Sequence, residues 1–246
     1  ANGLAADAAN PGERIFFLQR ASVDIGNNKT SVDGDTFRGV LGIEGDFEFL
    51  DRSFYWNAAY AQGISRSTFS SPNIIQTRFL EAVDAVRDAS GAIVCRSATA
   101  RANGCAPLNM FGLGSPSQAA LDYVGVQFVS ESKSIQTLYE ANFGGELFDL
   151  PAGAVSFNVG VEARYEKSDF NPNDPQERGV GRSAAITALT GKYDTFEYYG
   201  EGLVPIFGDN FNFPLMRRLE VEGAYRKVDH SQAGKDDSWS YGGRWY

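Results

Sequence analysis

The sequence predicts an all-β protein, a segment of about eight strands from an antiparallel up-and-down transmembrane β-barrel with long extracellular loops. From residue 154 to residue 167 apolar and polar side chains alternate without a break, and this period of two indicates a strand between an apolar and a wet environment. Strands in soluble domains usually have roughly 5 to 6 residues, whereas a bilayer requires a tilted strand of about 9 to 11 residues. The 27 glycines, 18 phenylalanines and 11 tyrosines among 246 residues agree with a β-rich chain.

The same alternation recurs along the chain, and each occurrence predicts a strand. Residues 37–47 and 54–60 alternate in this way on either side of a short connection at residues 48–53, which predicts a hairpin. Further strands are predicted at residues 135–143, 219–225 and 239–245, and weaker ones at residues 14–25 and 192–204.

The connections between these strands alternate between short and long. Outer-membrane barrels have short periplasmic turns and long extracellular loops, so residues 48–53 and 144–153 are expected to be periplasmic. Residues 64–126, 168–191 and 229–237 are expected to be extracellular. The connection at residues 205–218 fits this pattern less well, because it is periplasmic by order and yet long.

The connection at residues 64–126 has internal structure of its own. Apolar residues recur at helical spacing near residues 77–89, which predicts a short helix that ends at Ser90 and Gly91 and that serves as either a packed loop element or a lid. Cys95 and Cys105 are the only cysteines, and in an exported chain they predict a disulfide. Metal binding by the pair is not expected, because the spacing is not that of a CxxC site and His230, the sole histidine, is far away in sequence.

Composition excludes several other functions. A net charge of −9 argues against nucleic acid as a partner, since phosphate binding needs a basic surface. The acidity indicates either a solvated surface or a mouth that attracts cationic solutes. No run approaches the roughly 18 apolar residues of a membrane helix. A mean hydropathy of −0.28 does not exclude a barrel, whose lipid face is hidden in the alternation.

The sequence contains no recognisable catalytic, cofactor or metal site, so we expect a protein that is not an enzyme. His230 has no nucleophile motif near it, and the glycines at residues 179–181 lack the lysine of a phosphate-binding loop. The acidic segments at residues 171–174 and 236–237 do not follow a calcium-loop pattern and are interpreted as turns.

Strand parity places charged residues on the face opposite the apolar one. Ionised groups of both signs on one face need water or one another, and a barrel lumen or plug interface supplies both. The alternative is that they are structural cross-strand pairs. The lumen-facing candidates are Arg38, Glu44, Glu162, Arg164, Glu166, Glu220, Glu222 and Arg226.

Several segments resemble one protein family. DASGAIVCR at residues 88–96 and GCAPLNMFG at residues 104–112 resemble an extracellular loop of TonB-dependent outer-membrane receptors. GELFDLPAG at residues 145–153, VGVEARYE at residues 159–166, YGE at residues 199–201 and LEVEGAYR at residues 219–226 are similar to barrel turns and strands of the same family.

The resemblance implies active uptake of a scarce solute of the siderophore, vitamin or carbohydrate class across a bacterial outer membrane. Such receptors form a 22-stranded barrel with an N-terminal plug, and their implied partners are outer-membrane lipid, a small solute and the inner-membrane TonB complex. No plug domain or signal peptide is recognised within residues 1–246, so the chain is expected to be a middle piece of the barrel whose first and last strands do not pair with each other.

Two other interpretations stay open. The chain could be a small closed outer-membrane barrel with an adhesion or structural role. It could also be a secreted β-sandwich that binds carbohydrate on Trp56, Trp239 and Trp245.

Overall fold

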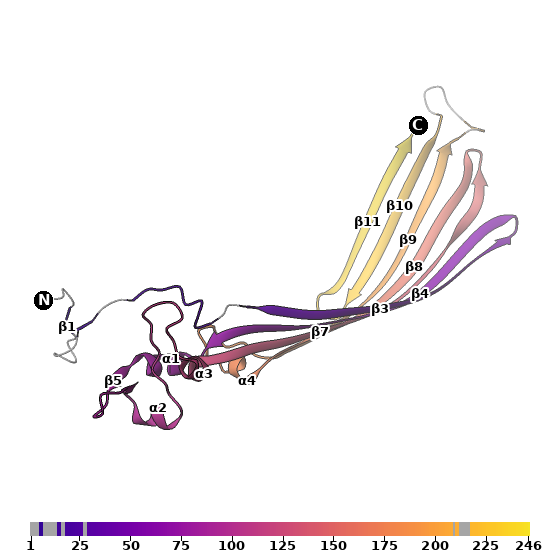
Figure 1. Cartoon of the computed structure of the whole chain (residues 1–246). Helices are drawn as coiled ribbons and strands as arrows, with labels where there is room; N and C mark the ends of the chain where they lie inside the picture. The colour runs from indigo at the N-terminus through magenta and orange to yellow at the C-terminus, as the bar shows by residue number, and fades with distance from the viewer. Residues whose placement is uncertain (1–4, 7–13, 16–17, 27–28, 209, 212–216) are drawn as a thin grey trace. The chain divides into compact units, whose positions relative to one another are not determined.

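A computed structural model describes residues 5–6, 14–15, 18–26, 29–208, 210–211 and 217–246 (Figure 1). The chain divides into two compact units. We call residues 32–69, 129–173 and 187–246 the sheet unit, and residues 1–31, 70–128 and 174–186 the loop unit.

The sheet unit is built on long strands. Its strands neighbour one another in the order β11-β10-β9-β8-β7-β4-β3, and the pairings of β7 with β8, β8 with β9, β9 with β10 and β10 with β11 are antiparallel (Figure 1). Over the described residues, 63% lie in strands and 11% in helices, which confirms the all-β class. The strands are β3 (Ser31–Phe49), β4 (Arg52–Ile74), β7 (Gly125–Leu150), β8 (Gly153–Pro172), β9 (Leu189–Phe207), β10 (Leu219–His230) and β11 (Gly234–Trp245).

The described sheet is open. β3 and β11 lie at its opposite edges, and no closed barrel is found in the described part of the chain. The described sheet has seven strands, whereas the alternation predicted about eight. The difference arises because the prediction of a strand at residues 14–25 was wrong. In that range only β2 (Arg14–Ile15), which pairs with β1 (Ala5–Ala6), is a described strand. Ile25, at the end of the predicted strand, instead packs into the core of the loop unit.

Two tight turns join strands at one end of the sheet. Leu50 and Asp51 connect β3 to β4 with φ values of 53° and 57°, which matches the two positive φ angles of the turn that suits a twisted hairpin. Pro151 and Ala152 connect β7 to β8, after a register shift between Glu146 and Asp149. Both turns are shorter than the connections expected at residues 48–53 and 144–153, because the strands extend further toward them.

At the other end the strands also continue beyond their predicted limits. β4 runs to Ile74, so the connection expected at residues 64–126 begins about ten residues later, and β8 runs to Pro172. These added residues are mostly polar and show no sustained alternation, yet the register of β7 with β8 continues as far as Ser130 opposite Pro172. Backbone pairing with an existing neighbour therefore extends a strand that its own sequence does not mark.

The described part of the loop unit contains four short helices and, besides the pairing of β1 with β2, a small hairpin of β5 and β6. The helix predicted near residues 77–89 is present but shorter, because residues 85–87 form β5, which pairs with β6. Asp88 accepts hydrogen bonds from the N–H groups of Ser90 and Ala92 and so forms the turn of this hairpin. The elements are α1 (Gln76–Val83), β5 (Ala85–Arg87), β6 (Ile93–Cys95), α2 (Ala98–Ala102), α3 (Gln118–Val124) and α4 (Asp174–Glu177).

A small apolar core holds the loop unit together. Serine side chains cap α2 and α3, with Ser97 accepting from the Ala100 N–H at 3.1 Å and Ser117 accepting from the Ala120 N–H at 3.2 Å. Cys95 and Cys105 form a disulfide with an S–S distance of 2.05 Å, as the sequence predicted. The buried core residues are Ile25, Ala82, Leu108, Ala120, Tyr123 and Val124.

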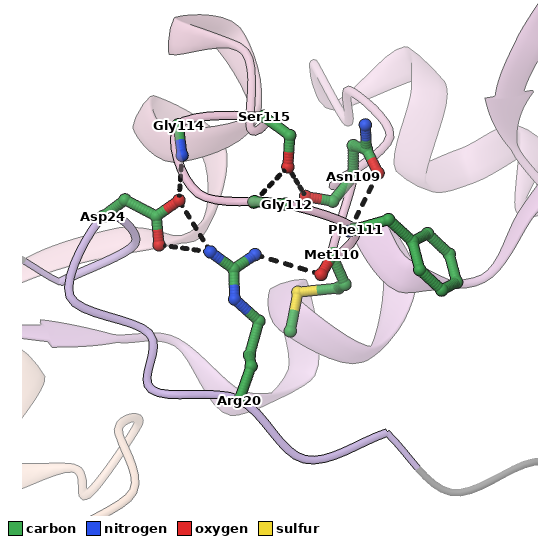
Figure 2. A network of polar contacts seen from close by, with 8 residues as sticks. All are labelled: Arg20, Asp24, Asn109, Met110, Phe111, Gly112, Gly114 and Ser115. Atoms are coloured by element: carbon green, nitrogen blue, oxygen red, sulfur yellow. Dashed lines mark hydrogen bonds and ion pairs between the residues drawn. The ribbon is translucent and has the colours of Figure 1, made fainter.

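An ion pair and hydrogen bonds connect the segment before Ile25 to the loop at residues 109–115 of the same unit (Figure 2). Arg20 donates to both carboxylate oxygens of Asp24, at 2.6 and 2.7 Å, and to the carbonyl oxygen of Met110 at 3.1 Å. Asp24 also accepts from the Gly114 N–H at 2.7 Å. The Gly114 hydrogen bond, followed by the effect of Arg20, holds the pKa of the Asp24 carboxyl below its usual value, against an opposing desolvation effect.

This contact is expected to weaken in acid. Because the pKa of Asp24 is lowered in the folded protein, its stabilising contribution is complete above the unfolded pKa near 3.9 and is lost as the pH falls through the lower folded value. Hydrogen exchange of residues 109–115 should lose protection on acidification below pH about 4. Asp24→Asn should show reduced protection already at neutral pH, whereas the control Asp122→Asn, at an exposed position of α3, should not. Equal protection in both variants would contradict the role of Asp24.

Candidate functional site

One face of the sheet is apolar across all seven strands. On β8 it carries the odd-numbered residues from Val155 to Tyr165, and the register places Phe143 opposite Val159 and Tyr198 opposite Val161. Many of these side chains are uncovered in the chain, with Leu41 71% and Tyr241 79% exposed. We call the uncharged part of this face the apolar band. It comprises the residues of this parity at 37–47, 54–60, 135–143, 155–165, 196–204, 219–225 and 239–245.

On the side of the long connections, the apolar band is bounded by charged residues. On six of the seven strands the next residue on the same face is charged, for example Lys167 on β8, Asp194 on β9 and Lys227 on β10. Lys167 pairs with Asp169 at 3.0 Å on this margin. The band spans eleven residues of β8 from Val155 to Tyr165, or about 33 Å of strand. At a tilt of about 40° this length corresponds to about 25 Å of membrane thickness, the height of the apolar band in membrane barrels.

Aromatic rings gather in two rows on the apolar band. Near the two tight turns, Phe54 stacks on Phe47 at 5.5 Å and on Phe143 at 5.8 Å, and Phe157 meets Phe143 edge-on at 5.6 Å. Farther along the strands, Tyr139 lies 5.1 Å from Tyr60 and 6.4 Å from Tyr165. The two rows lie toward opposite margins of the band, as aromatic girdles do in membrane barrels. Alternation alone did not reveal these rows, because they join strands distant in sequence.

The opposite face of the sheet is polar and carries all eight of the charged residues selected by strand parity. Phe47 packs on Phe54 on the apolar face, so Arg38 and Glu44, of the other parity on β3, belong to the polar face. The remaining six belong to β8 and β10, whose registers with β9 align them on the same face: Glu162, Arg164, Glu166, Glu220, Glu222 and Arg226.

Most of these residues have partners on the polar face. Glu162 pairs with Arg164 at 2.6 Å along β8, and Glu166 accepts from Gln136 at 2.7 Å. On β10 and its neighbours, Glu222 pairs with Arg244 at 2.7 Å, Glu220 with Arg218 at 2.6 Å and Arg226 with Glu197 at 3.4 Å. Cross-strand partners therefore occur for Glu166, Glu222 and Arg226, whereas Glu162, Arg164 and Glu220 are paired with residues two positions away in sequence.

A central network on this face includes residues that the sequence did not single out. The Asn142 amide donates to Asn57 at 3.0 Å and to Glu140 at 2.8 Å, and the Tyr199 hydroxyl donates to the Asn142 side-chain oxygen at 2.5 Å. The Arg226 guanidinium lies 4.9 Å from the centre of the Tyr199 ring. Gly160 makes room for this network, because a Cβ there would collide with Tyr199 and Asn142. Strand parity places Asn57, Glu140, Asn142 and Tyr199 on this face, and three of the four are uncharged side chains, which a search for charged residues does not select.

Comparison with protein-family models, curated proteins and solved structures finds no match to the chain. No helix in the described parts is long and apolar enough to cross a membrane. Among the same residues, no group of three or more histidine, cysteine and acidic side chains is arranged to hold a metal ion.

Proposed function

We propose that the chain forms part of the barrel wall of a TonB-dependent outer-membrane receptor that takes up a scarce solute. The observation that carries this proposal is the apolar band on one face of the sheet, which ends in charge and lies opposite a face of ion pairs and amides. Such a sheet separates an apolar environment from an aqueous one, as the wall of a membrane barrel does.

Strand length favours lipid over a second protein layer as the cover of the apolar band. A soluble sandwich packs two sheets about 10 Å apart and uses strands of roughly 5 to 6 residues. Here β7 has 26 residues and β8 has 20. The charged margin shifts in one direction across the sheet: Asp194 on β9 lies four residues beyond the partner of Lys227, and Lys167 on β8 lies two beyond the partner of Asp194. Such a steady shift suits tilted strands that cross a planar boundary between hydrocarbon and water.

The open edges favour a large barrel over a small closed one. Bacterial single-chain barrels have an even number of antiparallel strands, and their edges must be paired because unsatisfied backbone groups are costly in lipid. The described sheet has seven strands with β3 and β11 at opposite edges, so it fits a wider wall completed by further strands. The solvated ion pairs of the polar face suit a broad lumen or the surface of a plug.

Fluorescence quenching of the intact protein in lipid vesicles tests the membrane part of this proposal. Cys95 and Cys105 are bonded to each other, so a single introduced cysteine gives a unique labelling site. Val221→Cys places a fluorophore on the apolar band, and Ala224→Cys on the same strand is the matched control on the polar face. Lipids with a nitroxide in the acyl chain should quench the first label, and aqueous iodide the second. A sandwich would leave the label at residue 221 unquenched by lipid, which would overturn the proposal.

Accumulation by whole cells tests the uptake part. Cells that produce the intact receptor should accumulate one of three probes, ferrichrome, cyanocobalamin or maltohexaose, and deletion of TonB should abolish this accumulation. Accumulation that is indifferent to TonB, or none with any of the three probes, would contradict active uptake.

A further inference from the structure

A groove on the polar face lies at the level where the apolar band ends, on the side of the long connections. It has a volume of about 470 Å³ and is lined by residues of five strands, β3, β4, β7, β8 and β9, and by the turn after β10. Its level on β8 is Glu166 to Ser168, the level at which the opposite face turns from Tyr165 to Lys167. In the proposed orientation this is the outer margin of the membrane, where a solute arriving from outside first meets the wall.

Hydroxyl and amide side chains dominate the polar-face lining of the groove. Thr36 and Ser65 form one cross-strand hydroxyl pair at 3.0 Å, and Ser134 and Ser168 form a second at 3.1 Å. A hydroxyl has one donor and two acceptor positions, so each pair retains a donor and several acceptors for a bound molecule. Gln136 and Gln232 add amides to the lining.

The charges that line this groove on the polar face balance. Arg38 is the cation and Glu166 the anion, while the parity of Lys167 and Lys192 puts their side chains on the opposite face. Glu166 is already hydrogen bonded to Gln136 at 2.7 Å and to the Tyr193 hydroxyl. The groove therefore has no excess charge that would compensate a strongly charged ligand. A neutral ligand needs no such compensation.

An aromatic pair adjoins the hydroxyls. The rings of Tyr193 and His230 stack at 4.9 Å, and Tyr193 itself lines the groove. The His230 ring is held in place because its Nδ1 accepts the N–H groups of Gln232 and Ala233, at 3.1 and 3.0 Å. A rigid aromatic surface beside many hydroxyl donors and acceptors suits a ligand that presents both C–H faces and hydroxyl edges.

We propose that this groove is an outer binding subsite for a neutral, polyhydroxylated solute of the oligosaccharide class. The inference rests on the proposed function, because the groove faces incoming solute only if the sheet is the wall of an uptake barrel. It narrows the solute to one class and assigns recognition to Ser134, Ser168 and Tyr193, with Thr36, Ser65 and Gln232 around them.

Calorimetric titration of the intact receptor with maltohexaose and xylohexaose tests the inference. The protein is held in an amine-oxide detergent, because a glycoside detergent would compete for the groove. At least one hexasaccharide should bind, and Ser134→Ala combined with Ser168→Ala should raise its Kd about tenfold through loss of hydrogen bonds. Tyr193→Ala should raise the Kd at least as much. Ser240→Ala, on the same face toward the tight turns, is the matched control and should leave the Kd unchanged.

Each other outcome overturns a distinct claim. If lipid quenches the label at residue 221 but neither hexasaccharide binds, the inference is wrong and the proposed function stands. If a hexasaccharide binds and the groove variants bind it as tightly as the control, the site is wrong. If ferrichrome binds instead and the groove variants weaken it, the solute class is wrong. If the quenching test itself fails, the proposed function fails, whatever the titration shows.

Discussion

Replacement of Val159 by arginine is expected to destabilise the protein in a bilayer by about 2 to 4 kcal/mol, the cost of a cationic side chain near the middle of a lipid-facing strand. Val159 lies in the centre of the apolar band, opposite Phe143 on β7 and Gly200 on β9. Its side chain is only partly covered by the rest of the chain, with 45% of its surface exposed. The penalty would therefore come from lipid and not from a crowded core. The free energy of unfolding from lipid vesicles, measured by urea titration, gives the effect.

Asn158→Arg is the matched control, because it introduces the same side chain one residue away on the opposite face. Asn158 accepts from Tyr55 at 3.4 Å and donates to Glu201 at 3.4 Å, so an arginine there would meet a carboxylate and water. We expect a change below about 1 kcal/mol at this position. An equal or larger loss for Asn158→Arg would reverse the assignment of the two faces.

Removal of the Cys95–Cys105 disulfide is expected to destabilise the loop unit by about 3 kcal/mol in the chain-entropy model. The bond closes a loop with a sequence separation of 10 and ties β6 to the segment that follows α2. Cys95 is completely buried, and Cys105 packs against the apolar core that includes Leu108 and Val124. Loss of the bond would therefore free the hairpin of β5 and β6 together with α2.

Limited proteolysis of the intact protein measures this effect. Cys95→Ala combined with Cys105→Ala should expose new cleavage sites within residues 84–108, while the sheet remains resistant. Reduction of the wild-type protein should reproduce this pattern, which separates loss of the bond from any effect of alanine. Alkylation of both thiols in the unreduced native protein would contradict the bond itself.

Local alternation was enough to locate most strands and both faces of the sheet. Along β8, for example, successive side chains point to opposite faces whatever the neighbouring strands are, so the parity of Val159 and Glu162 could be assigned from sequence alone. The disulfide was equally accessible, because two cysteines allow a single pairing. Each of these inferences depends only on the residue and its nearest neighbours along the chain.

The ends of the elements and their contacts across the sheet required the tertiary structure. Ile25 belongs to an alternating run, yet it lies in the same apolar core of the loop unit as Tyr123, nearly one hundred residues away in sequence. The helix α1, which begins at Gln76, ends at Val83 because Ala85 pairs with Cys95 in a hairpin.

The strand period, the two faces and the disulfide follow from the order of residues along the chain, whereas the register depends on how the strands pack together. That register brings Phe54 against Phe143 and Ser134 against Ser168, and so creates the aromatic rows and the hydroxyl groove. The physical reason is that alternation is a property of one extended backbone. Register, by contrast, is a choice among pairings of two strands, and the hydrogen bonds and side-chain contacts between them settle it.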